Sequence, residues 1–82
     1  MSLLEEVLYD DYKQRIEYAY YLTLIDVLMG ITTEEILSEI PEYEDKEMYE
    51  FCEGIKRAIE FSSNKTYSEI QAEILKLKDK YE

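Results

Sequence analysis

The sequence predicts an all-α fold, a small helical bundle of three long helices plus one short helix. Gly occurs only twice and Pro once in 82 residues, so the chain lacks the turn residues that sandwiches and barrels need. Apolar residues recur at steps of three and four over residues 48–59 and 67–81, which is the period of an amphipathic helix. The length supports a single acidic helical domain covering residues 1–82.

The first long helix is predicted over residues 3–29. No Gly or Pro interrupts this stretch, and Gly30 follows it directly, at a position where glycine commonly ends a helix. The second half of the helix, from Tyr18 to Met29, is apolar on nearly every side. We therefore expect this helix at the centre of the bundle.

The short helix is predicted to begin after Thr32. Thr32 and Glu35 have the spacing of a capping box, in which the threonine side chain accepts a hydrogen bond from the amide three residues later. Pro41 disfavours helical geometry at Ile40. We therefore expect the short helix to end there.

The second long helix is predicted over about residues 45–61. Met48, Cys52, Ile55 and Ile59 form one apolar stripe along it, so Cys52 is interpreted as a small core residue rather than a reactive thiol. Gly54 lies inside this helix and costs roughly 1 kcal/mol relative to Ala. Close packing against another helix would explain the glycine.

The third long helix is predicted to begin after Thr66 and to run to Tyr81. Thr66 and Glu69 repeat the capping box. The 3-4-3-4 spacing of a coiled-coil seam is followed by Tyr67, Ile70, Ile74, Leu77 and Tyr81. Further apolar residues beside the seam favour packing inside the bundle over a homodimer through residues 67–81, and both interpretations stay open.

The predicted core consists of the apolar residues on these stripes. They are Leu4, Leu8, Leu22, Ile25, Leu28, Ile36, Leu37, Ile40, Met48, Cys52, Ile55, Ile59, Ile70, Ile74 and Leu77. Five tyrosines are predicted to lie in the core or at its edge: Tyr18, Tyr20, Tyr21, Tyr67 and Tyr81.

No residue pattern points to catalysis or to a cofactor. The chain has no histidine, which excludes Ser-His-Asp and Cys-His pairs and histidine-containing zinc sites. Its two glycines are isolated, so there is no glycine-rich phosphate-binding loop. Glu47, Glu50 and Glu53 could face a hard cation, but no EF-hand loop accompanies them. We predict that the protein is not an enzyme and has no catalytic residue, metal or cofactor.

Composition and charge indicate the compartment and the kind of partner. Cys52 is the only cysteine, which suits a reducing, cytoplasmic compartment. The most apolar stretch, residues 18–31, is too short for a bilayer and contains Asp26. A net charge of −11 repels nucleic acid and anionic membranes and attracts basic surfaces. We predict a protein partner with a basic surface, no direct nucleic-acid binding and no membrane association.

Most of the negative charge lies in one segment. Residues 32–53 contain nine acidic residues and one basic residue, whereas residues 54–82 contain five acidic and six basic residues. Tyrosine within such a segment offers rigid contact area to a partner. The predicted partner-binding residues are Glu42, Tyr43, Glu44, Asp45, Glu47, Tyr49, Glu50 and Glu53. Tyr9 and Tyr12, beside two aspartates, are predicted to take part in recognition as well.

Three functions fit these observations. The first is a small acidic inhibitor that blocks a basic surface of a partner protein, including a nucleic-acid-binding surface. Glutamates at every third helical position place one charge per about 4.5 Å, against about 3.4 Å per phosphate along a DNA strand. In composition the chain is similar to phage-encoded inhibitors, such as anti-CRISPR and restriction-blocking proteins.

The second function is an immunity protein or antitoxin that neutralises a basic toxin through the same acidic face. The third is a homodimeric structural or assembly module, in which the acidic residues serve solubility alone. Under this last interpretation the acidic segment is only a solvated surface.

Overall fold

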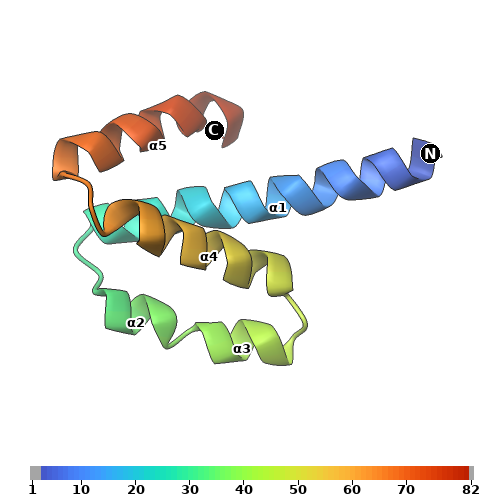
Figure 1. Cartoon of the computed structure of the whole chain (residues 1–82), viewed down its shortest axis with the longest axis horizontal. Helices are drawn as coiled ribbons and strands as arrows, with labels where there is room; N and C mark the ends of the chain where they lie inside the picture. The colour runs from blue at the N-terminus through green and yellow to red at the C-terminus, as the bar shows by residue number, and fades with distance from the viewer. Residues whose placement is uncertain (1–2, 82) are drawn as a thin grey trace.

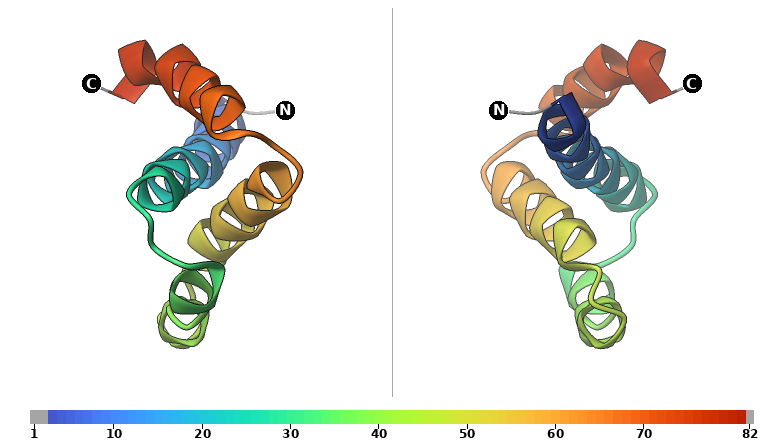
Figure 2. Two further views of the ribbon diagram at one scale, coloured as in Figure 1. Left: turned by 90° about the vertical axis from the view of Figure 1, so that its left-hand side faces the viewer. Right: turned by 90° about the vertical axis from the view of Figure 1, so that its right-hand side faces the viewer.

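Over the described residues 3–81, five helices lie in three layers (Figure 1, Figure 2). The computed structural model describes the backbone of residues 3–81 and the side chains of residues 11–81. The helices are α1 Leu3–Leu28, α2 Thr33–Leu37, α3 Ile40–Asp45, α4 Tyr49–Ser62 and α5 Tyr67–Tyr81. Figure 2 shows α5 in one outer layer, α1 and α4 in the middle, and α2 with α3 in the other outer layer. The predicted all-α class is confirmed, and α1, α4 and α5 are its three long helices.

The central helix α1 sets the length of the molecule. Its 26 residues span about 39 Å at 1.5 Å per residue, and the longest molecular axis is 42 Å. Gly30 has a φ of 90°, its amide donates to the Val27 carbonyl at 3.1 Å, and the Ile31 amide donates to the Asp26 carbonyl at 3.1 Å. These two bonds form a Schellman motif, so the predicted helix end at Gly30 is confirmed.

The segment between α1 and α4 contains two short helices where the sequence predicted one. The cap at the start of α2 is confirmed, because the Thr32 hydroxyl accepts a hydrogen bond from the Glu35 amide at 3.2 Å. Pro41, which was expected to end the short helix, instead lies in the first turn of α3. A proline is tolerated there because the first amides of a helix have no partner within the helix.

Helices α1 and α4 pack very closely, and Gly54 allows this contact. A Cβ atom at Gly54 would overlap the backbone oxygen of Ile16 and would lie 2.7 Å from the Ala19 Cβ atom and 2.9 Å from the Tyr20 nitrogen. Real Cβ atoms essentially never come under 3.0 Å of such neighbours. The expectation that helix packing explains this glycine is confirmed.

Helix α5 begins and packs as its sequence predicts. The Thr66 amide donates to the Glu69 carboxylate at 3.1 Å, and the Glu69 amide donates to the Thr66 hydroxyl at 3.2 Å, which completes the capping box. Ile70 and Ile74 are buried in one cluster with Leu24. The centre of the seam therefore packs on α1 within one chain, and a homodimer through residues 67–81 stays a prediction.

The core comprises two clusters on opposite sides of the α1–α4 layer. The first joins α1, α4 and α5 through Tyr21, Leu24, Ala58, Ile70 and Ile74. The second joins α2, α3 and α4 through Ile36, Ile40, Cys52 and Ile55. Six of the predicted core residues are thus buried, and Ile25, Leu28, Met48, Ile59 and Leu77 are partly buried.

Two predicted core residues are exposed. Leu22 is 39% and Leu37 42% exposed, because each lies on the side of its helix that no other helix covers. The core also takes Ile16, Ala19 and Leu24, which were not among the predicted core residues. Tyr21, predicted among the tyrosines of the core or its edge, is buried, and so is Ala58 on the stripe of α4. Leu4 and Leu8 lie outside the residues whose side chains are described. None of the helices in the described part of the chain has both the length and the apolar character that crossing a membrane requires.

Candidate functional site

The acidic residues of the middle segment gather on the outer layer formed by α2 and α3. All seven acids between residues 34 and 47 are exposed, and we call them the acidic surface: Glu34, Glu35, Glu39, Glu42, Glu44, Asp45 and Glu47. Lys46 is the only cation in this stretch, and it pairs with Glu42 at 3.2 Å. The acidic surface therefore has a strong net negative charge at neutral pH.

The acidic surface rests on a rigid apolar base. Ile36 and Ile40 are buried in the second core cluster. The Tyr43 ring stacks on Phe51 of α4 with ring centroids 5.8 Å apart and planes at 21°. These contacts hold one side of α2 and α3 against α4, so the carboxylates are displayed from the remaining sides.

Glu47 occupies a turn, not helix α4. It has a φ of 58°, and it is the C′ residue of a second Schellman motif that ends α3. In this motif its amide donates to the Glu44 carbonyl at 3.0 Å and the Met48 amide donates to the Tyr43 carbonyl at 2.8 Å. The predicted start of the second long helix at residue 45 was therefore wrong, and α4 begins at Tyr49.

Glu50 and Glu53 of α4 form ion pairs with basic side chains of the same chain. Glu50 accepts from Arg15 of α1 at 3.2 Å, and its side chain is only 15% exposed. Glu53 accepts from Arg57 one turn later at 2.9 Å. Glu47, Glu50 and Glu53, which are spaced three residues apart, therefore do not form one exposed row on a helix, because Glu47 lies in a turn and the Glu50 side chain is largely covered.

The tyrosines divide differently from the prediction. Tyr43 is half-buried against Phe51, so it supports the acidic surface from below, whereas Tyr49 is 57% exposed. Tyr18 and Tyr67, predicted to lie in the core or at its edge, are 40% and 65% exposed. The Tyr18 ring still lies at the edge of the first core cluster, where its centroid is 5.3 Å from that of Tyr81. The Tyr67 hydroxyl donates to the Leu28 carbonyl at 2.5 Å and thereby links α5 to the end of α1.

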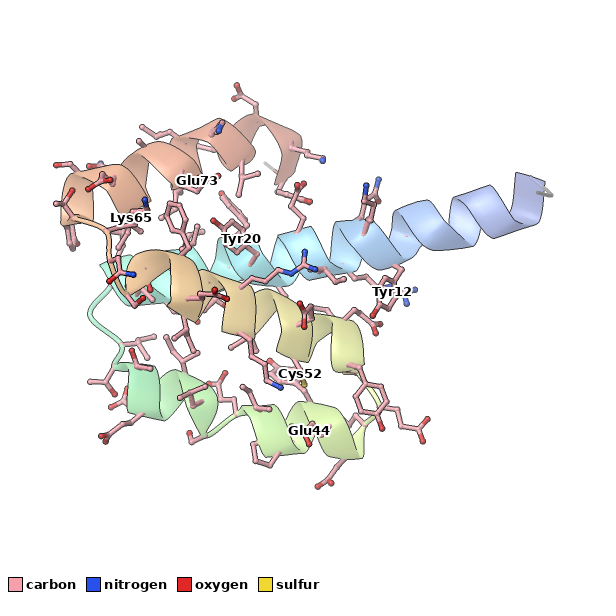
Figure 3. The ribbon with its side chains drawn as sticks, in the orientation of Figure 1. Tyr12, Tyr20, Glu44, Cys52, Lys65 and Glu73 are labelled. Carbon is pink, nitrogen blue, oxygen red and sulfur yellow. The ribbon has the colours of Figure 1, made fainter. Side chains whose placement is uncertain are left out.

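A hollow of about 440 Å³ lies beside the acidic surface, where α1, α3 and α4 meet. Tyr12 of α1, Tyr49 of α4 and Glu44 of α3 line it, with the buried Cys52 among its lining residues. Figure 3 shows Glu44 and Cys52 on facing elements of this region. Tyr12 is 48% exposed, and the Tyr9 side chain lies outside those described.

Cys52 has the environment of a core residue. Burial is the largest cause that raises the pKa of its thiol, and the negative charge of Glu44 adds to it. Its Sγ atom lies 3.8 Å from the Ile40 carbonyl oxygen, to which the thiol donates. A raised pKa disfavours the reactive thiolate at neutral pH. Among the described residues, no group of three or more acidic or cysteine side chains is placed to hold a metal ion.

Three residues of the acidic surface escaped the prediction of the site: Glu34, Glu35 and Glu39. They belong to the same acidic segment in sequence, and that charge count was the signal that could have found them. No protein-family model matches the chain, and searches of the curated proteins and of the solved structures found no match either. The function is therefore argued from the surface itself.

Proposed function

We propose that the protein is a small inhibitor that uses the acidic surface of α2 and α3 to block a basic, nucleic-acid-binding surface of a partner protein. The observation that carries the proposal is the density of exposed carboxylates on a rigid base. Seven exposed acids and one lysine occupy fourteen consecutive residues. Neighbouring like charges on a helix destabilise it by a few tenths of a kcal/mol per pair, so a surface needed only for solubility has no use for this bias.

The spacing of the acids on α3 supports a resemblance to a phosphate backbone. Glu39, Glu42 and Asp45 recur at every third residue at the start of α3 and along it. This spacing places a charge about every 4.5 Å along the helix axis, close to the roughly 3.4 Å between phosphates along one DNA strand. A lysine-rich or arginine-rich groove would meet a comparable row of negative charge.

The hollow beside the acidic surface supplies aromatic contacts for the same partner. Tyr12 and Tyr49 are both exposed large side chains, and both line this hollow. Tyrosine rings bind arginine and lysine through cation–π contacts, and aromatic anchors often contribute about 2 kcal/mol or more to an interface. We therefore assign long-range attraction to the carboxylates and short-range contact to the two rings.

The test removes four negative charges from the acidic surface and compares this with the removal of four negative charges elsewhere. Variant A carries Glu39→Gln, Glu42→Gln, Glu44→Gln and Asp45→Asn. A matched control, variant B, removes four charges from other helices: Asp11→Asn, Glu60→Gln, Glu73→Gln and Asp79→Asn. Both variants should retain the helical circular dichroism of the native protein.

The partner is first captured from the native host with the unmodified protein and then purified. We expect variant A to associate with it at least about tenfold more slowly at low salt, with a weaker salt dependence, because steering acts on the association rate. Variant B should resemble the unmodified protein, and only the unmodified protein and variant B should displace DNA from the partner. Equal association rates for both variants, or no competition with DNA, would contradict the proposal.

A further inference from the structure

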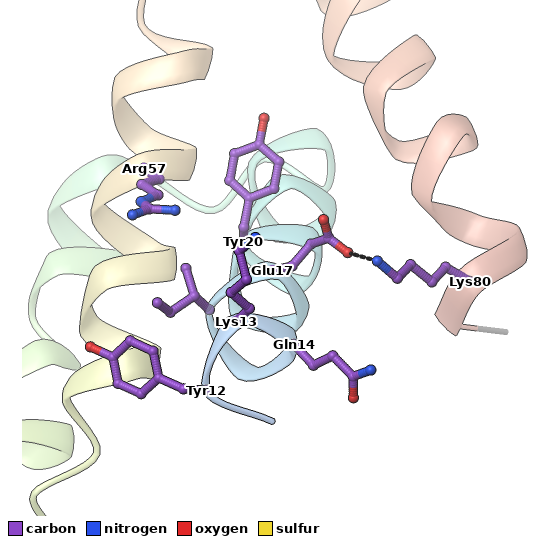
Figure 4. Close-up of a pocket in the computed structure, with 8 residues that line it drawn as sticks. Tyr12, Lys13, Gln14, Glu17, Tyr20, Arg57 and Lys80 are labelled. Atoms are coloured by element: carbon purple, nitrogen blue, oxygen red, sulfur yellow. Dashed lines mark ion pairs between the residues drawn. The ribbon is translucent and has the colours of Figure 1, made fainter. Parts of the chain in front are cut away.

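One side of α1 is left open by the helices that pack on it. On the α4 side, Gly54 meets Ile16 and Ala19, and on the α5 side Glu17 forms an ion pair with Lys80 at 2.6 Å (Figure 4). A third side carries four apolar residues at steps of four, three and four, which we call the open face: Tyr18, Leu22, Ile25 and Met29. Ile25 is half-buried and the other three are exposed, Met29 to 74%. The open face is therefore an apolar stripe in contact with solvent.

The open face differs in charge from the molecule as a whole. The chain has a net charge of −11, but the open face contains no acidic or basic residue. The acidic surface lies on α2 and α3, in a different layer of the molecule (Figure 2). A contiguous apolar patch on a small protein is typical of contact with another protein surface. An apolar partner suits the open face, in contrast to the basic partner proposed for the acidic surface.

The spacing of the open face continues toward the N-terminus of α1. In the sequence, Leu4 and Leu8 are in phase with the open face, and Asp11 and Arg15 occupy the two positions between. Together these positions alternate steps of four and three, as in the heptads of a coiled coil. Figure 1 shows the first turns of α1 extending beyond the ends of α4 and α5. Because most helical stability in proteins comes from packing, a second helix laid along α1 would stabilise these turns.

The size of a specific interface requires the whole length of α1. The open face spans residues 18–29, about 18 Å of helix, which at a width of about 10 Å gives an outline of only about 180 Å². All 26 residues of α1 give an outline of about 400 Å². Specific interfaces bury roughly 600–1,000 Å² of accessible surface per partner, and accessible surface exceeds a flat outline because it follows the side chains. Pairing along the full helix approaches this range, and pairing of the open faces alone does not.

Charge decides the orientation of two paired α1 helices. A parallel pair brings identical positions together, so Asp11 would face Asp11 of the second copy and Arg15 would face Arg15. An antiparallel pair with full overlap avoids both like-charge contacts. Its opposing residues are Leu4 with Met29, Leu8 with Ile25, Asp11 with Leu22 and Arg15 with Tyr18. The Arg15 side chain is 58% exposed and can contact the Tyr18 ring through a cation–π interaction.

We propose that α1 pairs antiparallel with α1 of a second copy of this chain, so that the N-terminal half of each helix covers the open face of the other. The polar pair Asp11 and Arg15 near the middle fixes the register and weakens the dimer. This interface is separate from the acidic surface and does not depend on the proposed inhibitory function. The two respond oppositely to salt: screening weakens attraction to a basic partner, whereas it relieves repulsion between two acidic chains.

Sedimentation equilibrium of the purified protein tests the dimer. We expect a monomer–dimer equilibrium with a dissociation constant on the order of 10–100 µM, tighter at 1 M than at 0.1 M salt, since the Debye length falls from about 10 Å to about 3 Å. Leu22→Glu should weaken dimerisation by at least about tenfold, because it places a charge in the interface. The matched control is Leu37→Glu on α2, which adds the same charge at an equally exposed leucine and should change the dissociation constant less than about twofold.

Disulfide cross-linking tests the orientation. Cys52 is first replaced by alanine, and Leu4→Cys and Met29→Cys are then made as two separate proteins. A disulfide needs Cα atoms within about 7 Å, so the antiparallel pair predicts a covalent dimer in a mixture of the two proteins and little in either alone. A parallel pair predicts the reverse, with each protein linking to itself.

Four outcomes would overturn the proposal. They are a monomer at every concentration up to the millimolar range, a dimer that weakens as salt is raised, equal weakening by Leu22→Glu and Leu37→Glu, and cross-linking of each cysteine protein by itself. Circular dichroism checks that each variant keeps the native helix content. Met29→Glu, at the most exposed position of the open face, serves as a second variant if Leu22→Glu perturbs the fold.

Discussion

Replacing Gly54 with alanine tests whether the approach of α1 to α4 limits the stability of the fold. In an isolated helix Gly→Ala is favourable by about 1 kcal/mol. Here the added methyl group would overlap the Ile16 carbonyl oxygen and press on Ala19 and Tyr20. Two of these three contacts are backbone atoms, which cannot rotate away as the end of a flexible side chain can.

The helices must therefore separate at their crossing, and a gap of about 0.5–1 Å already forfeits a quarter to a half of the local dispersion contacts. Overpacking of this kind costs about 1–3 kcal/mol, and we take the upper end because the obstacle is backbone. After the propensity gain, Gly54→Ala should lower the free energy of unfolding by about 2 kcal/mol. For a chain of this size this corresponds to a loss of roughly 8–16 °C in melting temperature.

Urea titration followed by circular dichroism at 222 nm measures the effect. The matched control compares Lys56→Gly with Lys56→Ala, because residue 56 is exposed on the same helix. There alanine should be the more stable variant by about 1 kcal/mol. A Gly54→Ala protein as stable as the native one would refute the close-packing argument.

Three further predictions concern single side chains. Glu47→Gly should raise the free energy of unfolding measured in urea by about 1 kcal/mol, because glycine tolerates the left-handed backbone of this turn. The control Glu44→Gly, inside α3, should lower the free energy of unfolding by a similar amount, and a stabilising Glu44→Gly would contradict the argument. The pKa of Glu17 is lowered in the folded state by its lysine and tyrosine partners. Its contribution to the free energy of unfolding is therefore present above pH 4.5 and lost as the pH falls through the lowered pKa of the folded state. The difference in stability between the native protein and Glu17→Gln should shrink on acidification, and a constant difference from pH 7 to pH 3 would refute this prediction. Ile74→Glu should destabilise the folded protein by roughly 3 kcal/mol or more, because it places a charge in the first core cluster. Leu75 is exposed, so the control Leu75→Glu should change the melting temperature little. Similar melting temperatures for the two variants would contradict the assignment of this seam to the bundle.

Local signals in the sequence determined where α1 ends and where α2 and α5 begin. The Thr32 and Thr66 caps and the glycine end at Gly30 are set by hydrogen bonds between residues at most five positions apart. Such bonds form in the same way whatever surrounds them, so the all-α class and the long helices followed from residue order alone. The acidic character of residues 32–53 is likewise a property of composition.

Only the tertiary structure decided which sides of the helices are covered and which acids are available. The second half of α1 is apolar all round, so its sequence could not reveal that Leu24 is buried while Leu22 is exposed. The Glu50 side chain is only 15% exposed and pairs with Arg15, a residue 35 positions away in sequence. The hollow beside the acidic surface likewise combines side chains from α1, α3 and α4. The physical reason is the same in each case: burial and charge pairing depend on which atoms of distant segments come within a few ångströms, and helical periodicity carries no information about that partner.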